Sequence, residues 1–209
     1  MFNMIQTCVQ MSSHFDYNKY ILIMEHIYKE SQFGEEWFGF PHLYTEMVNK
    51  FPTNSKFVEV GSWKGKSAAY MAVEIANSGK TIDFVCVDTW NGSEFHVTNN
   101  WPGLDKLYDT FKSNMRPLEK YYRDIRMPSV EAAKKFNDKS LDFVFIDACH
   151  EYESVRDDIE AWLPKVKNGG IIAGHDYTDR WPGVIRAVAE CLPATAKILG
   201  DTWLYEVGT

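Results

Sequence analysis

Acidic and imidazole side chains occur together at two places in the second half of the sequence. Asp147 and His150 follow one apolar run, and His175-Asp176 ends the next. Two carboxylates and an imidazole can hold a divalent cation, and carboxylate oxygens favour Mg²⁺ or Mn²⁺. A histidine beside such a site has a pKa suited to a general base. If the two runs form neighbouring strands, we expect Asp147, His175 and Asp176 around a metal, with His150 next to them.

Each of these side chains also has an ordinary structural alternative. A single histidine more often caps a helix or bonds to the backbone, but two Asp–His groupings at adjacent strand ends favour a functional site. Cys149 lies beside His150. Because the side chains of adjacent residues diverge, we interpret Cys149 as a packing residue and not as a nucleophile.

A glycine-containing segment follows an earlier apolar run, and it reads Glu59-Val-Gly61-Ser-Trp-Lys-Gly65-Lys-Ser67. A strand–glycine–helix turn brings backbone close to a ligand and presents unpaired N–H groups at the positive end of the helix dipole. The spacing from Gly61 to Gly65 is one residue shorter than a phosphate-binding P-loop needs, and Trp63 replaces the middle glycine of a dinucleotide loop. S-adenosylmethionine has no phosphate, so a loop that passes only its amino-acid part tolerates these side chains. The alternative is a plain tight turn.

Asp88 ends the next apolar run along the chain. A carboxylate at this place can accept hydrogen bonds from both ribose hydroxyls of an adenosine-containing cofactor. Alone, such an aspartate caps or turns the chain equally well. Its separation from the glycine segment by one strand–helix–strand unit favours the cofactor role.

Apolar runs and helical spacings alternate along most of the chain. This alternation predicts a parallel α/β sheet with right-handed crossovers, in which ligands bind at the carboxyl ends of the strands. The segment 89–118 follows neither pattern and is expected to be irregular. The expected strands are 56–60, 81–88, 121–127, 141–147 and 169–176, with a closing hairpin of 196–199 and 202–207, and the expected helices are 41–51, 67–79, 130–136, 154–166 and 182–192.

The composition excludes several classes of protein. The 209 residues suit one domain, and 29 acidic against 22 basic residues give a net charge of −7, which argues against partners such as nucleic acid or an anionic membrane. No stretch is long and apolar enough to span a bilayer, and the first residues do not resemble a signal peptide. The four cysteines form no CxxC pair, so we expect free thiols and a cytoplasmic location.

Aromatic residues are unusually abundant, at 15% of the chain with 7 tryptophans. Such side chains fill cores and line pockets. Trp63, Trp90 and Trp101 lie in or after the loops expected to form the cleft. We therefore expect part of the aromatic excess to line a pocket.

Together these segments resemble the class I S-adenosylmethionine-dependent methyltransferases, and among them the small macrocin-type and other sugar O-methyltransferases. The resemblance covers about residues 56–207. It implies a Rossmann-like seven-stranded sheet, mostly parallel with the last strand antiparallel, and helices on both faces. The motifs that carry it are FVEVGSWKGKSA, CVDTW, SLDFVFIDACHEY, RDDIEAWLPKVKNGG and GHDY followed by WPGV.

The resemblance also implies roles for single residues. The D-x-x-H arrangement of metal-dependent relatives matches Asp147 and His150, as metal ligand and general base. Glu59, Gly61 and Gly65 would lie along the methionine part of the cofactor, Asp88 at the ribose and Ser129 near the adenine. The full set of expected cofactor-binding residues is Glu59, Gly61, Ser62, Trp63, Gly65, Ser67, Asp88, Thr89, Ser129 and Asp147.

The sequence thus predicts an enzyme that transfers a methyl group from S-adenosylmethionine to a hydroxyl of a sugar or small metabolite, with metal assistance. One alternative is a P-loop kinase or NTPase that depends on Lys66. Another is a nicotinamide-dependent oxidoreductase, for which Tyr108 and Lys112 give the one Y-x-x-x-K match. A third is a non-catalytic module that binds an adenosyl cofactor and does not need His150.

We expect two parts in the chain, an N-terminal helical cap over residues 1–54 and the methyltransferase domain over 55–209. The cap and the aromatic segment 89–118 are expected to close over the cofactor and shape the acceptor pocket. The expected partner is a small-molecule acceptor, and aromatic side chains near the N-terminus could support a homodimer.

Overall fold

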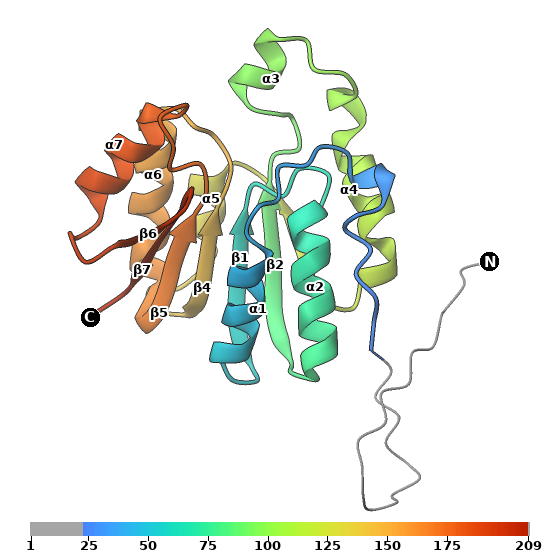
Figure 1. Ribbon diagram of the computed structural model, residues 1–209, viewed down its shortest axis with the longest axis horizontal. Coiled ribbons are helices and arrows are strands. Elements are labelled where there is room, and N and C mark those ends of the chain that lie inside the picture. Colours follow the sequence, from blue (N-terminus) through green and yellow to red (C-terminus); the bar gives the residue numbers. More distant parts are fainter. Residues whose placement is uncertain (1–22, 209) are drawn as a thin grey trace, which may run out of the picture.

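The computed structural model describes residues 23–208 (Figure 1). Its centre is a seven-stranded sheet with the strand order β3-β2-β1-β4-β5-β7-β6. Strands β1 to β5 pair in parallel, and β7 is antiparallel to both β5 and β6. The predicted fold class and closing hairpin are therefore confirmed. The strands are β1 (Ser55–Val60), β2 (Ile82–Asp88), β3 (Arg123–Arg126), β4 (Leu141–Ile146), β5 (Val166–Gly174), β6 (Lys197–Leu199) and β7 (Thr202–Glu206).

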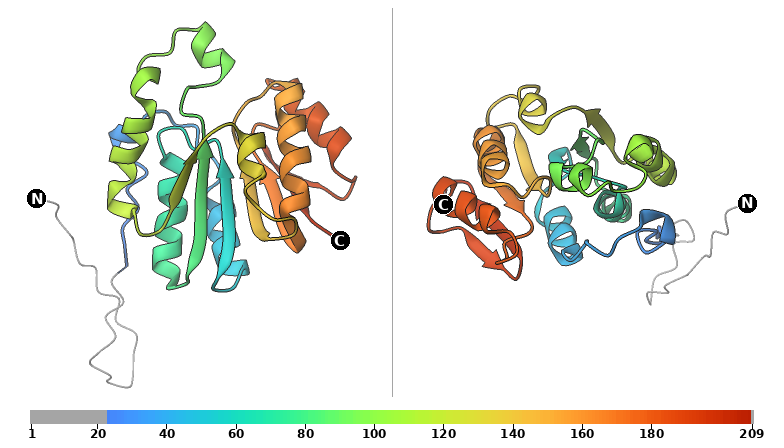
Figure 2. Two further views of the ribbon diagram at one scale, coloured as in Figure 1. Left: turned by 180° about the vertical axis from the view of Figure 1, so that it is seen from behind. Right: turned by 90° about the horizontal axis from the view of Figure 1, so that it is seen from above.

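Helices cover both faces of the sheet (Figure 2). One face packs against α1 (Pro41–Lys50), α2 (Lys66–Ser78) and α4 (Leu107–Met115), and the other against α5 (Ser129–Ala133), α6 (Tyr152–Trp162) and α7 (Pro182–Cys191). Phe57 belongs to the first core and Val58 to the second, because successive side chains of a strand point to opposite faces. By the same alternation Glu59 points into the first core.

The segment 89–118, expected to be irregular, contains two helices. A short helix, α3, covers Glu94–Thr98, and α4 buries Leu107, Phe111 and Met115 on one face. These three residues recur every four positions, which is helical spacing. The prediction of an irregular segment was therefore wrong for residues 107–115, where three widely spaced apolar residues are enough to anchor a helix on the sheet.

The end of α6 also differs from the prediction. A helix was expected over 154–166, but α6 ends at Trp162, a 3₁₀ turn follows, and β5 begins at Val166. Pro164 explains the early end because it lacks an N–H donor and restricts the residue before it. Gly169 lies inside β5 with φ +78°, in the stretch where the register between β4 and β5 shifts.

The described part of the N-terminal segment packs into the same core as α2. Phe33, Phe40, Tyr44 and Met47 are all buried there. The remainder of the expected cap, residues 1–22 with Cys8, lies outside the described residues. The division between a cap and a catalytic domain at residue 54 stays a prediction.

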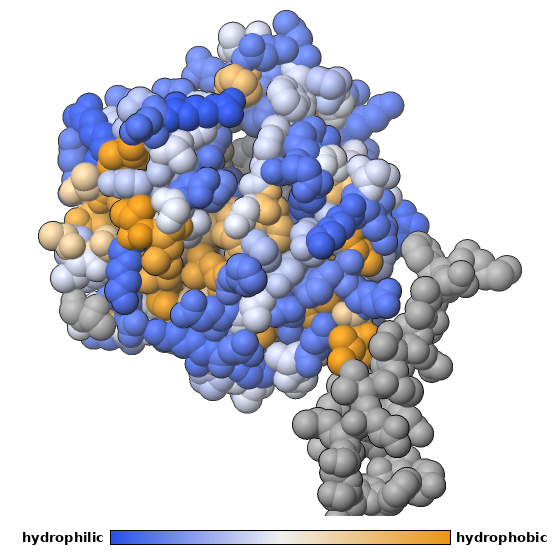
Figure 3. All heavy atoms as spheres, in the orientation of Figure 1, coloured by the Kyte–Doolittle hydropathy of each residue, from blue (hydrophilic) through white to orange (hydrophobic). Residues whose placement is uncertain are grey.

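Residues 23–208 contain no helix that is long and apolar enough to cross a membrane. Their three cysteines, Cys86, Cys149 and Cys191, are free, as expected. Figure 3 shows apolar side chains gathered over the β5–β7–β6 end of the sheet, where Ile198 and Leu199 of the edge strand are exposed.

Candidate active site

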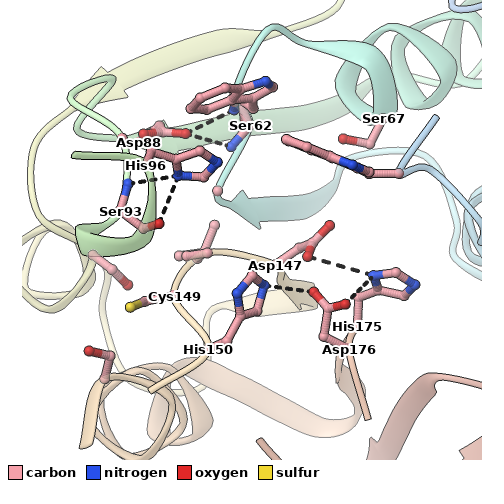
Figure 4. A pocket seen from close by; sticks show the side chains of 18 of the residues that line it. Ser62, Ser67, Asp88, Ser93, His96, Asp147, Cys149, His150, His175 and Asp176 are labelled. Carbon is pink, nitrogen blue, oxygen red and sulfur yellow. Dashed lines mark hydrogen bonds and ion pairs between the residues drawn. The ribbon is translucent and has the colours of Figure 1, made fainter. Parts of the chain in front are cut away.

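The carboxyl ends of β1, β2, β4 and β5 open onto one cavity of about 860 Å³ (Figure 4). This is the edge of a parallel sheet at which ligands bind. Glu59 and Gly65 lie behind the cavity wall. The other predicted site residues all line it: Gly61, Ser62, Trp63, Ser67, Asp88, Thr89, Ser129, Asp147, His150, His175 and Asp176.

Asp88 anchors the glycine loop, residues 61–65. One carboxylate oxygen accepts the backbone N–H groups of Ser62 and Trp63, both at 2.9 Å, and the other accepts that of Trp90 at 2.7 Å. Burial raises the pKa of Asp88, and these backbone hydrogen bonds act against the rise. Three of about four lone-pair sites of the carboxylate are thus used within the protein.

Gly61 is required by the close approach of two strand ends. The N–H of Gly61 donates to the carbonyl of Val87, and that of Asp147 donates to the carbonyl of Val60, each at 2.8 Å. Gly61 has φ +90°, and a Cβ atom there would lie 2.0 Å from the carbonyl oxygen of Asp147. A side chain at this position would therefore force β1 and β4 apart.

Glu59 lies beneath the glycine loop as a buried carboxyl, 1% exposed. The hydroxyl of Ser67 donates to Oε1, and Oε2 has no hydrogen-bond partner. Burial raises the pKa of Glu59 to about 8; the Ser67 hydrogen bond opposes the rise, and the charges of Asp147 and Asp88 add to it. At this pKa Glu59 is mostly protonated near neutral pH.

We expect Glu59→Gln to remove a pH dependence of stability. Because the folded pKa of about 8 is above the ordinary value of 4.5, the unfolded chain ionises first, and the free energy of unfolding falls as pH rises between these values, by up to about 1.4 kcal/mol per unit. Glutamine has the same shape and no charge. The measurement is urea unfolding of both proteins at pH 5, 6.5 and 8, values chosen to span roughly the titration range.

The expected result is similar stability at pH 5 and a growing advantage of the Glu59→Gln variant toward pH 8. The difference between the two proteins isolates Glu59, since all other groups titrate in both. Parallel curves for the two proteins would contradict a buried, protonated Glu59.

The Asp–His cluster adjoins the glycine loop at Asp147, and its other three residues lie farther from the loop in Figure 4. His150 Nε2 lies 2.7 Å from Asp176 Oδ2, and the His150 ring stacks on Trp181 with centroids 4.1 Å apart. His175 Nδ1 lies 3.6 Å from Asp176 and 3.8 Å from Asp147. Asp147, His175 and Asp176 each offer one possible metal-ligand atom, and these three atoms lie within 4.8 Å of one another. The two sequence groupings therefore form one cluster, as predicted.

The ionisation of this cluster is set by burial and by mutual attraction. Burial raises the pKa of Asp147 to about 6 against the lowering effect of His175. Burial would also raise the pKa of Asp176, but hydrogen bonds from His150 and His175 hold it well below its usual range. The pKa of His175 is raised: burial lowers it, but the hydrogen bond to Asp176 and the charge of Asp147 outweigh burial. Asp176 is thus the permanently charged centre of the cluster.

Another wall of the cavity is formed by residues that follow β2 and β3. Ser129 begins α5, and its hydroxyl oxygen accepts a hydrogen bond from Trp162 Nε1 at 2.8 Å. Nearby, burial raises the pKa of Asp158 to about 6, with a Ser129 hydrogen bond opposing. Thr89, after β2, accepts a hydrogen bond at Oγ1 from the N–H of Asn91. This wall combines polar groups with the apolar side chains of Met127 and Val130, which also line the cavity.

The strap, residues 34–40, forms another wall; the N-terminal segment was expected to cover the pocket, but these individual residues were not predicted. The amine of Lys66 donates to the carbonyls of Gly34 and Glu35 and pairs with Glu36 at 2.8 Å. A P-loop lysine must be free to reach a phosphate, and this amine is committed to the strap. The aromatic string Trp37-Phe38-Gly39-Phe40 was the signal for a wall, but its tie to α2 depends on contacts between distant residues.

The roof of the cavity is formed by α3, within the aromatic segment that was expected to cover the pocket, although its residues were not singled out. His96 stacks on Trp63 at 4.4 Å, and Phe95 makes an edge contact with Trp181 at 6.1 Å. Trp101 lines the cavity, as expected. Trp90 does not: its side chain is buried, its Nε1 donates to the carbonyl of Trp63, and the prediction of a cleft position was wrong. Its ring packs in the core against Tyr108 and Phe111.

This geometry can be compared with known proteins. Residues 58–177 match the family described as Methyltransferase domain. The chain belongs to this methyltransferase family. The match contains the glycine loop, Asp88 and the whole Asp–His cluster. The chain thus contains a methyltransferase domain, in agreement with the resemblance of its motifs.

Two relatives in sequence are both described as uncharacterized. Protein R132 of Acanthamoeba polyphaga mimivirus is 26% identical over 177 residues, which are 83% of this methyltransferase and 72% of R132. Protein y4gI of Sinorhizobium fredii is 27% identical over 128 residues, 61% of this chain. The methyltransferase spans only 14% of the length of y4gI.

Solved structures share the fold of this methyltransferase. The O-methyltransferase NovP aligns with a TM-score of 0.61 at 19% identity, over 79% of this chain and 78% of NovP. CalS11, a TDP-rhamnose 3'-O-methyltransferase of calicheamicin biosynthesis, aligns with a TM-score of 0.58 at 16% identity, over 81% of this chain and 78% of CalS11. At these identities the likeness establishes the architecture.

Proposed function

We propose that this methyltransferase transfers the methyl group of S-adenosylmethionine to a hydroxyl of a sugar or other small metabolite. The observation that carries the proposal is the Asp147–His150–His175–Asp176 cluster, which lines the same cavity as the glycine loop. O-methylation needs a methyl donor held in line with a hydroxyl and a group that accepts the hydroxyl proton. NovP and CalS11 are named as O-methyltransferases.

His150 would accept the proton of the acceptor hydroxyl. Its Nε2 faces the ionised Asp176 at 2.7 Å, so the neutral ring keeps its proton on Nε2 and a lone pair on Nδ1. The stack on Trp181 fixes the plane of the ring. Asp176 would thereby orient His150 and stabilise the charge that the ring gains.

The donor set of the cluster fits a divalent cation. Two carboxylates and one imidazole, with ligand atoms within 4.8 Å of one another, match the preferences of Mg²⁺ and Mn²⁺, with the imidazole favouring Mn²⁺. Asp147, His175 and Asp176 would hold the ion. When bound, it would supply Lewis acidity that lowers the pKa of a nearby hydroxyl.

The glycine-loop side fits the cofactor. Gly61, Ser62 and Asp88 line the cavity, and a glycine at position 61 lets the backbone approach a ligand closely. Asp88 would accept a hydrogen bond from the ribose through the acceptor site that its backbone contacts do not use. Ser129 would lie near the adenine. Glu59 and Gly65 would support the loop from behind, since neither lines the cavity.

Titration calorimetry with S-adenosylmethionine and S-adenosylhomocysteine tests the cofactor. We expect both to bind, and Asp88→Ala to weaken both because it frees the loop. No heat of binding at millimolar cofactor would contradict the proposal. A panel of sugars and phenols, assayed for S-adenosylhomocysteine formation with and without EDTA, then tests hydroxyl methylation and the metal. Cofactor binding that never yields product would favour a binding module.

The location, partners and oligomeric state of the protein are further proposals. We propose a cytoplasmic enzyme with a small-molecule acceptor and no nucleic-acid partner, in keeping with the net charge of −7. We also propose a homodimer, for which sedimentation of the full chain is the test.

A further inference from the structure

The ring of His96 has a defined tautomer. The backbone N–H of Ser93 donates to Nδ1 at 3.2 Å, and the Ser93 hydroxyl lies 2.7 Å from the same nitrogen. Because an amide nitrogen can only donate, Nδ1 carries the lone pair, and the proton of the neutral ring is on Nε2. The described residues offer no hydrogen-bond partner to Nε2. His96 is thus a neutral N–H donor in need of an acceptor.

Its neighbours hold this donor over the glycine loop. The His96 ring stacks on Trp63 with centroids 4.4 Å apart and an angle of 26°, and it meets Trp101 edge-on at 5.4 Å. His96 lines the cavity, and Figure 4 shows its free nitrogen on the cavity side of the ring. The Ser93 contacts and the two indoles leave the ring little freedom to turn.

The glycine loop itself has few donors left. The N–H of Gly61 donates to Val87, those of Ser62 and Trp63 donate to Asp88, and that of Gly65 donates to the carbonyl of Ser62. Four backbone N–H groups of the loop are therefore used within the protein.

Cations near the loop are also committed. The Lys66 amine is bonded to the strap, and the Lys64 amine is paired with Glu35 at 3.0 Å. Arg180 lies over the Trp181 ring, which stacks on His150 at the cluster side of the cavity. The loop side of the wall carries the carboxyl groups of Glu35 and Glu36. On the loop side of the cavity, His96 therefore offers a side-chain donor where Lys64 and Lys66 are already bonded.

We propose that the Nε2–H of His96 binds the α-carboxylate of the methionyl part of the cofactor. The inference rests on the proposed use of S-adenosylmethionine, whose amino-acid end is a zwitterion that passes the glycine loop. Burial, and next the charge of His150, lower the pKa of His96, so the ring stays neutral near pH 7 and acts as a hydrogen-bond donor. His96 would be a cofactor-binding residue supplied by the roof.

Calorimetry with two ligands tests this contact. One is S-adenosylhomocysteine, and the other is its decarboxylated counterpart, S-adenosyl-3-thiopropylamine, which lacks only the carboxylate. We expect His96→Phe, which keeps an aromatic ring, to weaken S-adenosylhomocysteine binding about 10- to 100-fold, as for the loss of a charge-assisted hydrogen bond. Binding of the decarboxylated ligand should change less than about twofold, since it has no partner for His96.

Two further variants separate the contact from a change in the roof. His96→Gln offers an amide donor and should lose less affinity for S-adenosylhomocysteine than His96→Phe. Phe95→Leu loosens the same helix and should affect both ligands alike. Thermal melting of each variant confirms that it is folded.

The outcomes are distinguishable. Equal losses for both ligands in His96→Phe, or no loss for either, would overturn the carboxylate contact and leave the proposed cofactor intact. Absence of binding of both ligands to the unaltered protein would overturn the contact together with the proposed function. A loss confined to S-adenosylhomocysteine supports both.

Discussion

Asp176→Asn is expected to lower the rate of methyl transfer by about 100-fold to 10,000-fold, the usual contribution of a positioned acid–base group. Asp176 contacts His150 at 2.7 Å and lies 3.6 Å from His175, so one change removes the charge that orients the base and one of three candidate metal ligands. The measurement is the initial rate of S-adenosylhomocysteine formation with an acceptor from the panel.

Asp179→Asn is the matched control, because Asp179 lies on the same loop with an exposed side chain. We expect its rate to stay within about twofold, as for surface changes away from the site. Calorimetry with Mn²⁺ should show weaker binding to Asp176→Asn and unchanged binding to Asp179→Asn. A folded Asp176→Asn enzyme with nearly full activity would contradict the proposed role of the cluster.

Gly61→Ala is expected to destabilise the protein by about 3 to 5 kcal/mol, the sum of a backbone clash and a left-handed conformation. The added Cβ would lie 2.0 Å from the carbonyl oxygen of Asp147 and 2.8 Å from Cα of Ala148. At 2–4 °C per kcal/mol for a chain of this size, the melting temperature should fall by roughly 10 °C. Differential scanning calorimetry measures the effect.

Gly79→Ala isolates the conformational part of this cost. Gly79 also has a positive φ, +66°, but a Cβ there would meet nothing within 4 Å. We expect a loss of only about 1–2 kcal/mol. If both alanine variants melt at similar temperatures, the contact between the ends of β1 and β4 is looser than the structure indicates.

The sequence was most informative where one element could be recognised from its own residues. The apolar runs that became β1, β2, β4 and β5 are short and buried, so strand assignments were possible without knowledge of the rest of the chain. Asp147 and His175 come together because parallel strands end at the same edge of the sheet. That topological rule, applied to two motifs, was sufficient to predict the cluster.

Features that depend on distant contacts could not be predicted. The strap is positioned by Lys66, whose amine bonds to carbonyl groups 31 and 32 residues away. Asp88 was expected to bind a ribose or to turn the chain; its bond from the N–H of Trp90 fits the turn. Its bonds from Ser62 and Trp63, 26 and 25 residues away, had no local signal. The contact between Ser93 and His96, by contrast, is local, but it forms only because α3 begins at Glu94.

The roof and the strap differ in how firmly they are attached, and this difference sets the route by which molecules exchange. The roof contacts the walls through aromatic pairs at His96 and Phe95, each contributing about 0.5–1.5 kcal/mol. The strap is fastened by a buried ammonium group with three oxygen partners. Lifting α3 therefore costs far less than releasing the strap. Product departure should follow the α3 side, on the microsecond-to-millisecond timescale of loop opening, while the strap remains a fixed part of the binding surface through every turnover.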